Sequence, residues 1–189
     1  MLSGIISESQ SAFVPDHLIT DNAIAAFEIN HWLHRKTKGK TGYAALKIDM
    51  SKAYDRVEWD FVMGVFRRMG FDEKWCKWIQ LCMLTVAYKL VVSGNEIGPF
   101  VPSRGLRQDD HISSHLFLLC AEGLSALIRR QQVMETIHGC KIANGAPVVI
   151  HFFFVDDCYL FFRANDMEAN CIKECLIIYE RASGQQVNF

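Results

Sequence analysis

The sequence contains no uninterrupted apolar run long enough to cross a membrane, although half of its 189 residues are hydrophobic. A membrane-spanning helix needs about 20 predominantly apolar residues. The first residues, M-L-S-G-I-I-S-E, also lack the basic region and the long apolar core of a secretory signal. These absences predict a soluble, intracellular protein without a membrane segment.

Cysteine pairs in C-x-x-C spacing are missing as well, although the chain has seven cysteines. Such pairs are typical of zinc sites and redox motifs. Several cysteines instead fall on the apolar faces of expected helices, where a free thiol packs as a small hydrophobic side chain. We therefore expect reduced thiols in the core, no disulfides and no structural zinc.

Neither sign of charge is in excess, because 20 Lys and Arg residues face 21 Asp and Glu residues and the net charge is −1. This balance excludes a protein that binds nucleic acid over its whole surface, so nucleic-acid contacts must come from local patches. Arg104 and Arg107 form one such patch, since they flank a Gly-Leu turn beside Gln108 and just before an expected helix. Repeats, low-complexity stretches and long linkers are also absent, which indicates one domain or part of a larger one.

A pair of acids separates two apolar runs in residues 148–162, V-V-I-H-F-F-F-V-D-D-C-Y-L-F-F. The β-branched and aromatic residues predict a hairpin of two strands with Asp156 and Asp157 at its tip. Two adjacent carboxylates between buried strands repel each other unless a cation, or a phosphate ligand with its metal, lies beside them. The tip is therefore a candidate metal site, and the alternative interpretation is an Asp-rich solvated turn.

A third carboxylate lies near the end of another expected strand, Tyr43–Met50. The two-residue alternation of a strand places Lys47 and Asp49 on one face. Mg²⁺ is usually held by one or two carboxylates, with phosphates and water completing its shell. Asp49 together with Asp156 and Asp157 fits this pattern, and we expect these carboxylates to need a counter-ion because no balancing cation is expected nearby.

Four sequence blocks, in this order, resemble the reverse transcriptase of non-LTR (LINE-type) retrotransposons, and the plant members match best in spacing. The blocks are Q-S-A-F-V-P at 10–15, K-I-D-M-S-K-A-Y-D-R-V-E-W at 47–59, R-G-L-R-Q at 104–108 and F-V-D-D at 154–157. The resemblance covers nearly the whole chain. It implies an α+β fold that comprises the fingers and palm portion of a right-hand polymerase, with the thumb absent. About residues 1–42 would belong to the fingers, and residues 43–189 mainly to the palm with inserted fingers-side elements.

The resemblance also implies RNA-templated DNA synthesis with an RNA template, a DNA primer and dNTPs as partners. Two Mg²⁺ (or Mn²⁺) ions would be held by Asp49, Asp156 and the backbone carbonyl of Met50, with Asp157 supporting the catalytic pair. Their role in such enzymes is to activate the primer 3′-hydroxyl and to stabilise the leaving pyrophosphate.

The nucleotide pocket implied by the resemblance includes Tyr54, Gln108, Arg104 and Arg107. Tyr54 would close over the nucleotide sugar and exclude a 2′-hydroxyl. A core tyrosine is the alternative interpretation of this residue. Gln108 would line the pocket for the incoming nucleotide and the template base.

The chain departs from the family pattern in two blocks. Asp16 and His17 replace a Gly-Arg pair after F-V-P, and Asp109 and His111 replace the glycine and the proline of R-G-L-R-Q-G-D-P. Asp109 adds a side chain and a negative charge where a triphosphate is expected, and His111 removes a residue suited to the first helical turn. Together with the absent thumb, these departures predict weak or no polymerase activity.

Two other functions remain open at the level of the sequence. One is a non-catalytic remnant that still binds nucleic acid, and Asp109 is the feature that favours it. The other is a metal-dependent phosphohydrolase that uses Asp110, His111 and His115, because the two histidines share a helical face beside carboxylates. Metal bound there instead of at Asp49 would favour the phosphohydrolase.

Apolar residues recur at helical spacing in several segments and predict amphipathic helices. In the segments 21–34 and 72–84, large apolar residues are expected to face the core. They are Ile24, Phe27, Trp32, Trp75 and Trp78.

Other elements are expected from caps and turns. Capping boxes at Asp55 with Glu58 and at Asn165 with Glu168 predict two helix starts. Strands are expected on both sides of two turns. They are 86–93 and 97–101 around Gly94-Asn95, and 137–142 and 147–154 around Asn144-Gly145.

Overall fold

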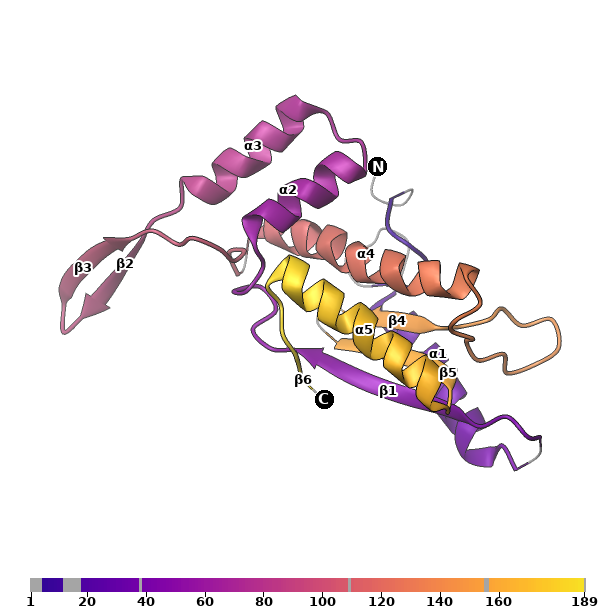
Figure 1. Ribbon diagram of the computed structural model, residues 1–189. Coiled ribbons are helices and arrows are strands. Elements are labelled where there is room, and N and C mark those ends of the chain that lie inside the picture. Colours follow the sequence, from indigo (N-terminus) through magenta and orange to yellow (C-terminus); the bar gives the residue numbers. More distant parts are fainter. Residues whose placement is uncertain (1–4, 12–17, 38, 109, 155–156, 189) are drawn as a thin grey trace.

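The computed structural model describes residues 5–11, 18–37, 39–108, 110–154 and 157–188. These residues form a sheet with helices on both faces and a helix-hairpin unit that projects from it (Figure 1). The helices are α1 (Ile19–Arg35), α2 (Trp59–Arg68), α3 (Glu73–Leu84), α4 (His111–Val133) and α5 (Asp166–Ser183). The strands are β1 (Tyr43–Met50), β2 (Tyr88–Val92), β3 (Asn95–Phe100), β4 (His151–Phe154), β5 (Asp157–Arg163) and β6 (Val187–Asn188).

The main sheet has four strands in the order β4-β5-β1-β6, and all neighbours are antiparallel. β1 forms where the sequence predicts it, and β4 and β5 form the predicted hairpin. The register of β1 with β5 runs from Tyr43 opposite Arg163 to Asp49 opposite Asp157. The end of β1 therefore lies beside the tip of the hairpin.

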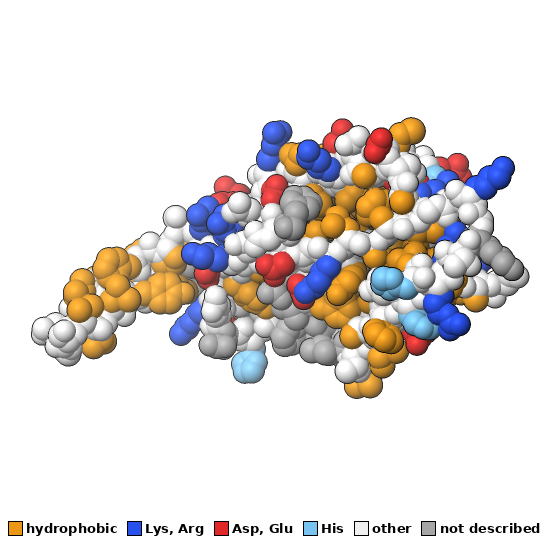
Figure 2. Space-filling view, turned by 90° about the horizontal axis from the view of Figure 1, so that it is seen from below, with side chains coloured by type: hydrophobic (Ala, Val, Ile, Leu, Met, Phe, Trp, Pro, Cys, Tyr) orange, Lys and Arg blue, Asp and Glu red, His pale blue; other side chains and the backbone are white. Residues whose placement is uncertain are grey.

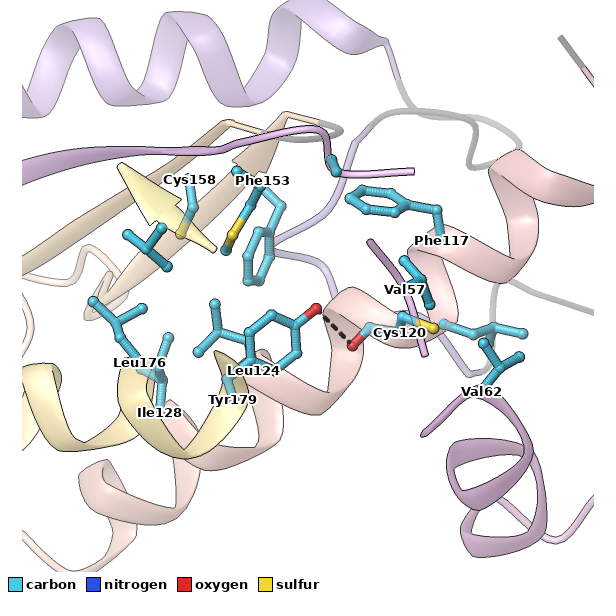
Figure 3. Close-up of a cluster of buried hydrophobic side chains, with 14 of the residues drawn as sticks. Val57, Val62, Phe117, Cys120, Leu124, Ile128, Phe153, Cys158, Leu176 and Tyr179 are labelled. Carbon is cyan, nitrogen blue, oxygen red and sulfur yellow. Dashed lines mark hydrogen bonds between the residues drawn. The ribbon is translucent and has the colours of Figure 1, made fainter. Parts of the chain in front are cut away.

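The alternation of β1 and β5 divides the sheet into two faces. Ile48 and Leu160 point toward α4 and α5, and both are fully buried in the main core. Part of this core is visible in Figure 3, where the Tyr179 hydroxyl of α5 donates a hydrogen bond to the Cys120 carbonyl of α4 at 3.3 Å. On the other face, Phe161 packs in a smaller cluster that includes residues of α1.

Helix α4 is by length and composition apolar enough to cross a membrane, but 61% of its most apolar 18-residue window is buried within the fold. It packs against α2 and α5 and contributes Leu116, Phe117 and Leu124 to the main core. The position of α4 in the core accounts for its apolar composition, since a helix that is apolar on most sides needs neighbours on most sides. All seven cysteines are free thiols, and five of them are buried.

The expectation that large apolar residues of α1 and α3 face the core is wrong for four of the five. Ile24 and Phe27 are 61% and 70% exposed, because α1 contacts the sheet through Ala26 and Ile29 on another side of the helix. Trp32 is half-buried against that cluster.

The two tryptophans of α3 are also exposed, Trp75 to 56% and Trp78 to 47%. Helix α3 packs against α2 and buries Cys76, Ile79 and Met83. Trp75 and Trp78 stay exposed because this packing covers the stripe formed by those three residues.

Residues 73–101, which comprise α3 and the β2-β3 hairpin, form an arm that projects from the sheet and its helices (Figure 1). Apolar side chains gather along this arm, and Figure 2 shows many of them on its projecting end. The exposed large hydrophobic residues of the arm are Trp75, Trp78, Leu81, Leu84, Tyr88, Leu90, Val91, Val92, Ile97, Phe100 and Val101.

Three local predictions are corrected by the structure. Glu58, not Asp55, is the N-cap of α2. The β2-β3 turn is formed by Ser93 and Gly94, one residue earlier than predicted, since both have positive φ. The segment 137–142 forms no strand and contributes a single bridge, between Cys140 and Val149. The cap of α5 at Asn165 is confirmed.

Backbone hydrogen bonds hold the block R-G-L-R-Q against the loop that follows β1. The Gly105 amide donates to the Val57 carbonyl at 2.8 Å, and the Leu106 amide donates to the Tyr54 carbonyl at 2.7 Å. The Trp59 indole donates to the Gly105 carbonyl at 2.7 Å. Two blocks far apart in the sequence are thereby fixed side by side.

Gly105→Ala is expected to separate these blocks, because Gly105 has φ +89° and an added Cβ would lie 2.8 Å from the Asp55 carbonyl oxygen. Urea unfolding should show a loss of stability of about 2–4 kcal/mol from left-handed strain and the backbone clash together. Gly145→Ala is the matched control, with φ +85° and no heavy atom within 4 Å of its Cβ. An equal loss in both variants would show that strain alone acts and that the close contact is unimportant.

A buried polar cluster fixes the start of β4 against α4. His151 Nε2 lies 2.8 Å from Ser125 Oγ of α4 and 2.9 Å from Ser9 Oγ. Burial, together with a smaller effect of the nearby Arg129 charge, lowers the pKa of His151 from 6.5 to about 3. His151 is therefore neutral in the folded chain at neutral pH.

Because the pKa of His151 is lower in the folded chain than in the unfolded chain, its neutral form supports folding above pH 6.5 and this support is lost as the pH falls toward 3. Between pH 6.5 and 5 the loss should be about 2 kcal/mol. Urea unfolding of the parent, His151→Gln and His34→Gln measures it, since His34 is exposed. Only His151→Gln should have a shallower slope of stability with pH, and an unchanged slope would show that another group titrates.

Candidate functional site

Two of the three predicted catalytic carboxylates lie on neighbouring strands. Asp49 of β1 is directly opposite Asp157 of β5 in the antiparallel register. Side chains at such positions have Cβ atoms about 4.5–5.5 Å apart. Asp49 is exposed and Asp157 is half-buried. Both belong to the face of the sheet that is turned away from α4 and α5, and Figure 2 views the molecule from this side.

The expectation that no cation balances these carboxylates is wrong. Lys47 Nζ lies 2.8 Å from Asp157 Oδ2. The hydrogen bond and the negative charge of Asp157 raise the pKa of Lys47, and the charges of Tyr159 and Asp49 contribute in the same direction. The site thus contains an internal cation. The alternation of β1 had placed Lys47 on the Asp49 face, but the sequence could not show which acid it reaches.

Strand β6 adds a polar neighbour that the sequence analysis did not identify. Asn188 pairs with Asp49 in the sheet, and its side-chain amide donates to Asp49 Oδ2 at 3.3 Å. Asn188 therefore orients Asp49 from the strand edge opposite to Asp157.

Met50 lies at the end of β1 with its side chain in the main core, 5% exposed. Only its backbone is thus suited to a ligand role. Four other predicted site residues lie outside the residues that the structure describes: Asp16, His17, Asp109 and Asp156.

The predicted nucleotide-binding residues lie around the junction where the block R-G-L-R-Q meets the loop that follows β1. The Tyr54 ring is half-buried and stacks on Phe117 of α4, with ring centroids 4.8 Å apart and planes 16° apart. The Gln108 amide donates to Asp55 Oδ1 at 3.2 Å, and Arg104 pairs with Glu58 at 3.3 Å. These contacts bring Tyr54, Arg104 and Gln108 to the loop that directly follows Asp49.

A cavity of about 250 Å³ opens beside this junction, between the block R-G-L-R-Q and the base of the arm. Arg104 and Arg107 line it together with Asp55 and Asp110, and Trp59 supplies apolar wall. Both arginines are exposed. The cavity therefore offers cations and aromatic surface in one concave region, and Gln108 lies at the adjoining junction.

The proposed phosphohydrolase residues are not arranged as a metal site. The Asp110 carboxylate caps α4 by accepting a hydrogen bond from the Ile112 amide at 3.0 Å, and His111 and His115 are exposed. Within the described part of the chain, no group of three or more His, Cys, Asp or Glu side chains is placed to hold a metal. The structure thus does not favour the phosphohydrolase alternative.

The sequence matches known proteins across its length. The family model described as reverse transcriptase (RNA-dependent DNA polymerase) matches residues 1–188. The uncharacterized 149 kDa protein of the Xenopus laevis transposon TX1 is 25% identical over 190 residues, which cover 100% of this chain and 14% of that protein.

Two further curated relatives match in part. The Pol polyprotein of the type-1 retrotransposable element R2 of Popillia japonica is 25% identical over 85% of this chain and 25% of its own length. An uncharacterized mitochondrial protein of Arabidopsis thaliana is 43% identical over 35% of this chain and 55% of its own length. The chain therefore spans little more than half, or much less, of these relatives.

The fold is similar to that of telomerase from Candida tropicalis. A telomerase structure in complex with a fragment of telomeric RNA matches with a TM-score of 0.62 at 12% identity, over 88% of this chain and 28% of the telomerase chain. A telomerase structure truncated of its C-terminal domain matches with a TM-score of 0.60 at 13% identity, over 88% of this chain and 34% of that one. With the family match over nearly all of its residues and transposon proteins among its relatives, this chain belongs to the reverse transcriptase family of non-LTR retrotransposons.

Proposed function

We propose that the chain is the catalytic portion of an RNA-directed DNA polymerase, in which residues 43–189 form mainly the palm and about residues 1–42 belong to the fingers. The observation that carries this proposal is the register that sets Asp49 opposite Asp157 on the open face of the sheet. Two carboxylates on adjacent central strands, reachable from one side, are the arrangement that a transferring phosphate with its metal requires.

The donor set fits a hard divalent cation, because carboxylate and carbonyl oxygens are the ligands that Mg²⁺ and Mn²⁺ prefer. In this proposal Asp49, Asp156 and the Met50 carbonyl hold the cations, and Asp157 supports the pair. When bound, divalent cations lower the pKa of the primer 3′-hydroxyl and neutralise charge on the leaving pyrophosphate.

The remaining roles follow from where the chain places its side chains. Tyr54, fixed by Phe117, limits the space beside the nucleotide sugar. Arg104 and Arg107 attract the triphosphate, and Gln108 orients the base pair from the same junction. The face of the sheet that carries Asp49 takes up the RNA template and the DNA primer, whose backbone contacts then depend on salt.

Asp49→Asn should weaken Mn²⁺ or Mg²⁺ binding at least about tenfold, because a direct ligand and its charge are both lost. Isothermal titration calorimetry on the parent, Asp49→Asn and Asp156→Asn measures the affinity. Asp60→Asn is the matched control, since Asp60 is an exposed acid in the first turn of α2. If Asp49→Asn binds metal as tightly as the control, the proposed function loses its metal site.

Asp109→Gly should increase the rate of primer extension on an RNA template, which is expected to be slow in the parent. The reason is that the substitution removes a negative charge and a side chain from the expected triphosphate site. The KM for dNTP should fall about fivefold, and Asp109→Gly with His111→Pro should act at least as well. Asp49→Asn should abolish extension in the parent and in both Asp109→Gly variants. An unchanged KM and turnover in an already active parent would make Asp109 a tolerated variation, and RNA binding without extension in every variant would identify a non-catalytic remnant.

A further inference from the structure

Lys47 lies beside the carboxylates of the site, although only the carboxylates and the Met50 carbonyl were expected to bind metal. It precedes Asp49 by two residues on β1 and therefore shares its face of the sheet. Its register partner on β5 is Tyr159, so Asp157 is its diagonal neighbour across the two strands. Diagonal neighbours of this kind are within reach of long side chains.

The contact between Lys47 and Asp157 is short and accessible from solvent. Their charged atoms are 2.8 Å apart, and the side chains are 52% and 34% exposed. Asp157 is therefore already paired with a cation, whereas Asp49 accepts a hydrogen bond from the uncharged amide of Asn188 and forms no ion pair within 4 Å among the described residues. Among the described residues, the two opposed acids thus differ in their partners.

This difference has a direct consequence for cation binding. A carboxylate that neutralises an ammonium group at 2.8 Å has less to gain from a second cation, and the ammonium group repels a divalent ion placed beside it. A cation that enters the site is accordingly directed to Asp49 and away from Asp157.

We propose that Lys47 is a positioning residue that reserves Asp157 as its ion-pair partner and keeps it from becoming a direct metal ligand. The inference rests on the proposed function, because it concerns the same metal site. Lys47 sets the number of carboxylates that reach the cations, and it lowers the affinity of the site for the first of them.

Mn²⁺ titration by calorimetry tests this role with Lys47→Met, Asp157→Asn and the double variant. Lys47→Met should tighten Mn²⁺ binding about three- to tenfold, because Asp157 becomes free to bind and a repulsive charge is removed. In the Asp157→Asn background the same substitution should change the affinity less than twofold. Lys47→Arg should restore the parent affinity, since it retains the charge and the reach.

Lys89→Met is the matched control. Lys89 pairs with Glu96 at 2.6 Å on the arm and its side chain is 60% exposed, so its removal takes away a similar ion pair far from Asp49. It should leave Mn²⁺ affinity unchanged, whereas a tightening equal to that of Lys47→Met would attribute the effect to net charge and overturn the inference.

A second measurement needs no metal. Without metal, Lys47→Met leaves Asp49 and Asp157 facing each other without their cation, so the thermal midpoint should fall. It should return toward the parent value in the double variant with Asp157→Asn. An equal fall of the thermal midpoint in Lys47→Met and in the double variant would show that Lys47 contributes through packing alone.

The outcomes separate this inference from the proposed function. Metal binding that depends on Asp49 but is insensitive to Lys47, or that tightens equally with and without Asp157, overturns the role of Lys47 and leaves the metal site standing. Metal binding that ignores Asp49 overturns both.

Discussion

The antiparallel pairing of β1 with β5 is the constraint on which the site depends. Seven consecutive residue pairs, from Tyr43 with Arg163 to Asp49 with Asp157, fix the register. A slip of one residue would exchange the faces and would bring Ile48 to the open side and Asp49 into the core. Because Ile48 and Leu160 are fully buried, the hydrophobic core itself secures the position of the acids.

Backbone contacts extend this constraint to the residues proposed to bind the nucleotide. The carbonyl groups of the loop after β1 accept hydrogen bonds from the Gly105 and Leu106 amides. The loop therefore fixes the position of the block R-G-L-R-Q. On the opposite side of β1 from β5, the side-chain amide of Asn188 in the edge strand β6 donates a hydrogen bond to Asp49. β1 and its loop thus contact each of the segments that contribute to the site.

The parts of the fold that the sequence predicted are those governed by local rules. Residues 46–50 alternate between apolar and polar side chains, and Asn165 caps a helix through its own side chain. The exposure of Phe27 and Trp78 could not be predicted, because helical spacing shows that a helix has an apolar stripe but not whether a neighbour covers it. The partner of Lys47 was missed for a related reason: the choice between two acids depends on the diagonal across β5, which a single strand does not contain.

The arm has a mechanical consequence for the site. α3 packs against α2 and buries Cys76, Ile79 and Met83 in the main core, whereas the hairpin packs mainly on itself. One end of the arm follows Gly70, and the other leads through Pro102 directly into Arg104 and the residues that hold the second block to the loop after β1. Only Pro102 and Ser103 separate the arm from Arg104, so a partner that holds the apolar surface of the arm would act on the proposed nucleotide pocket through this short connection.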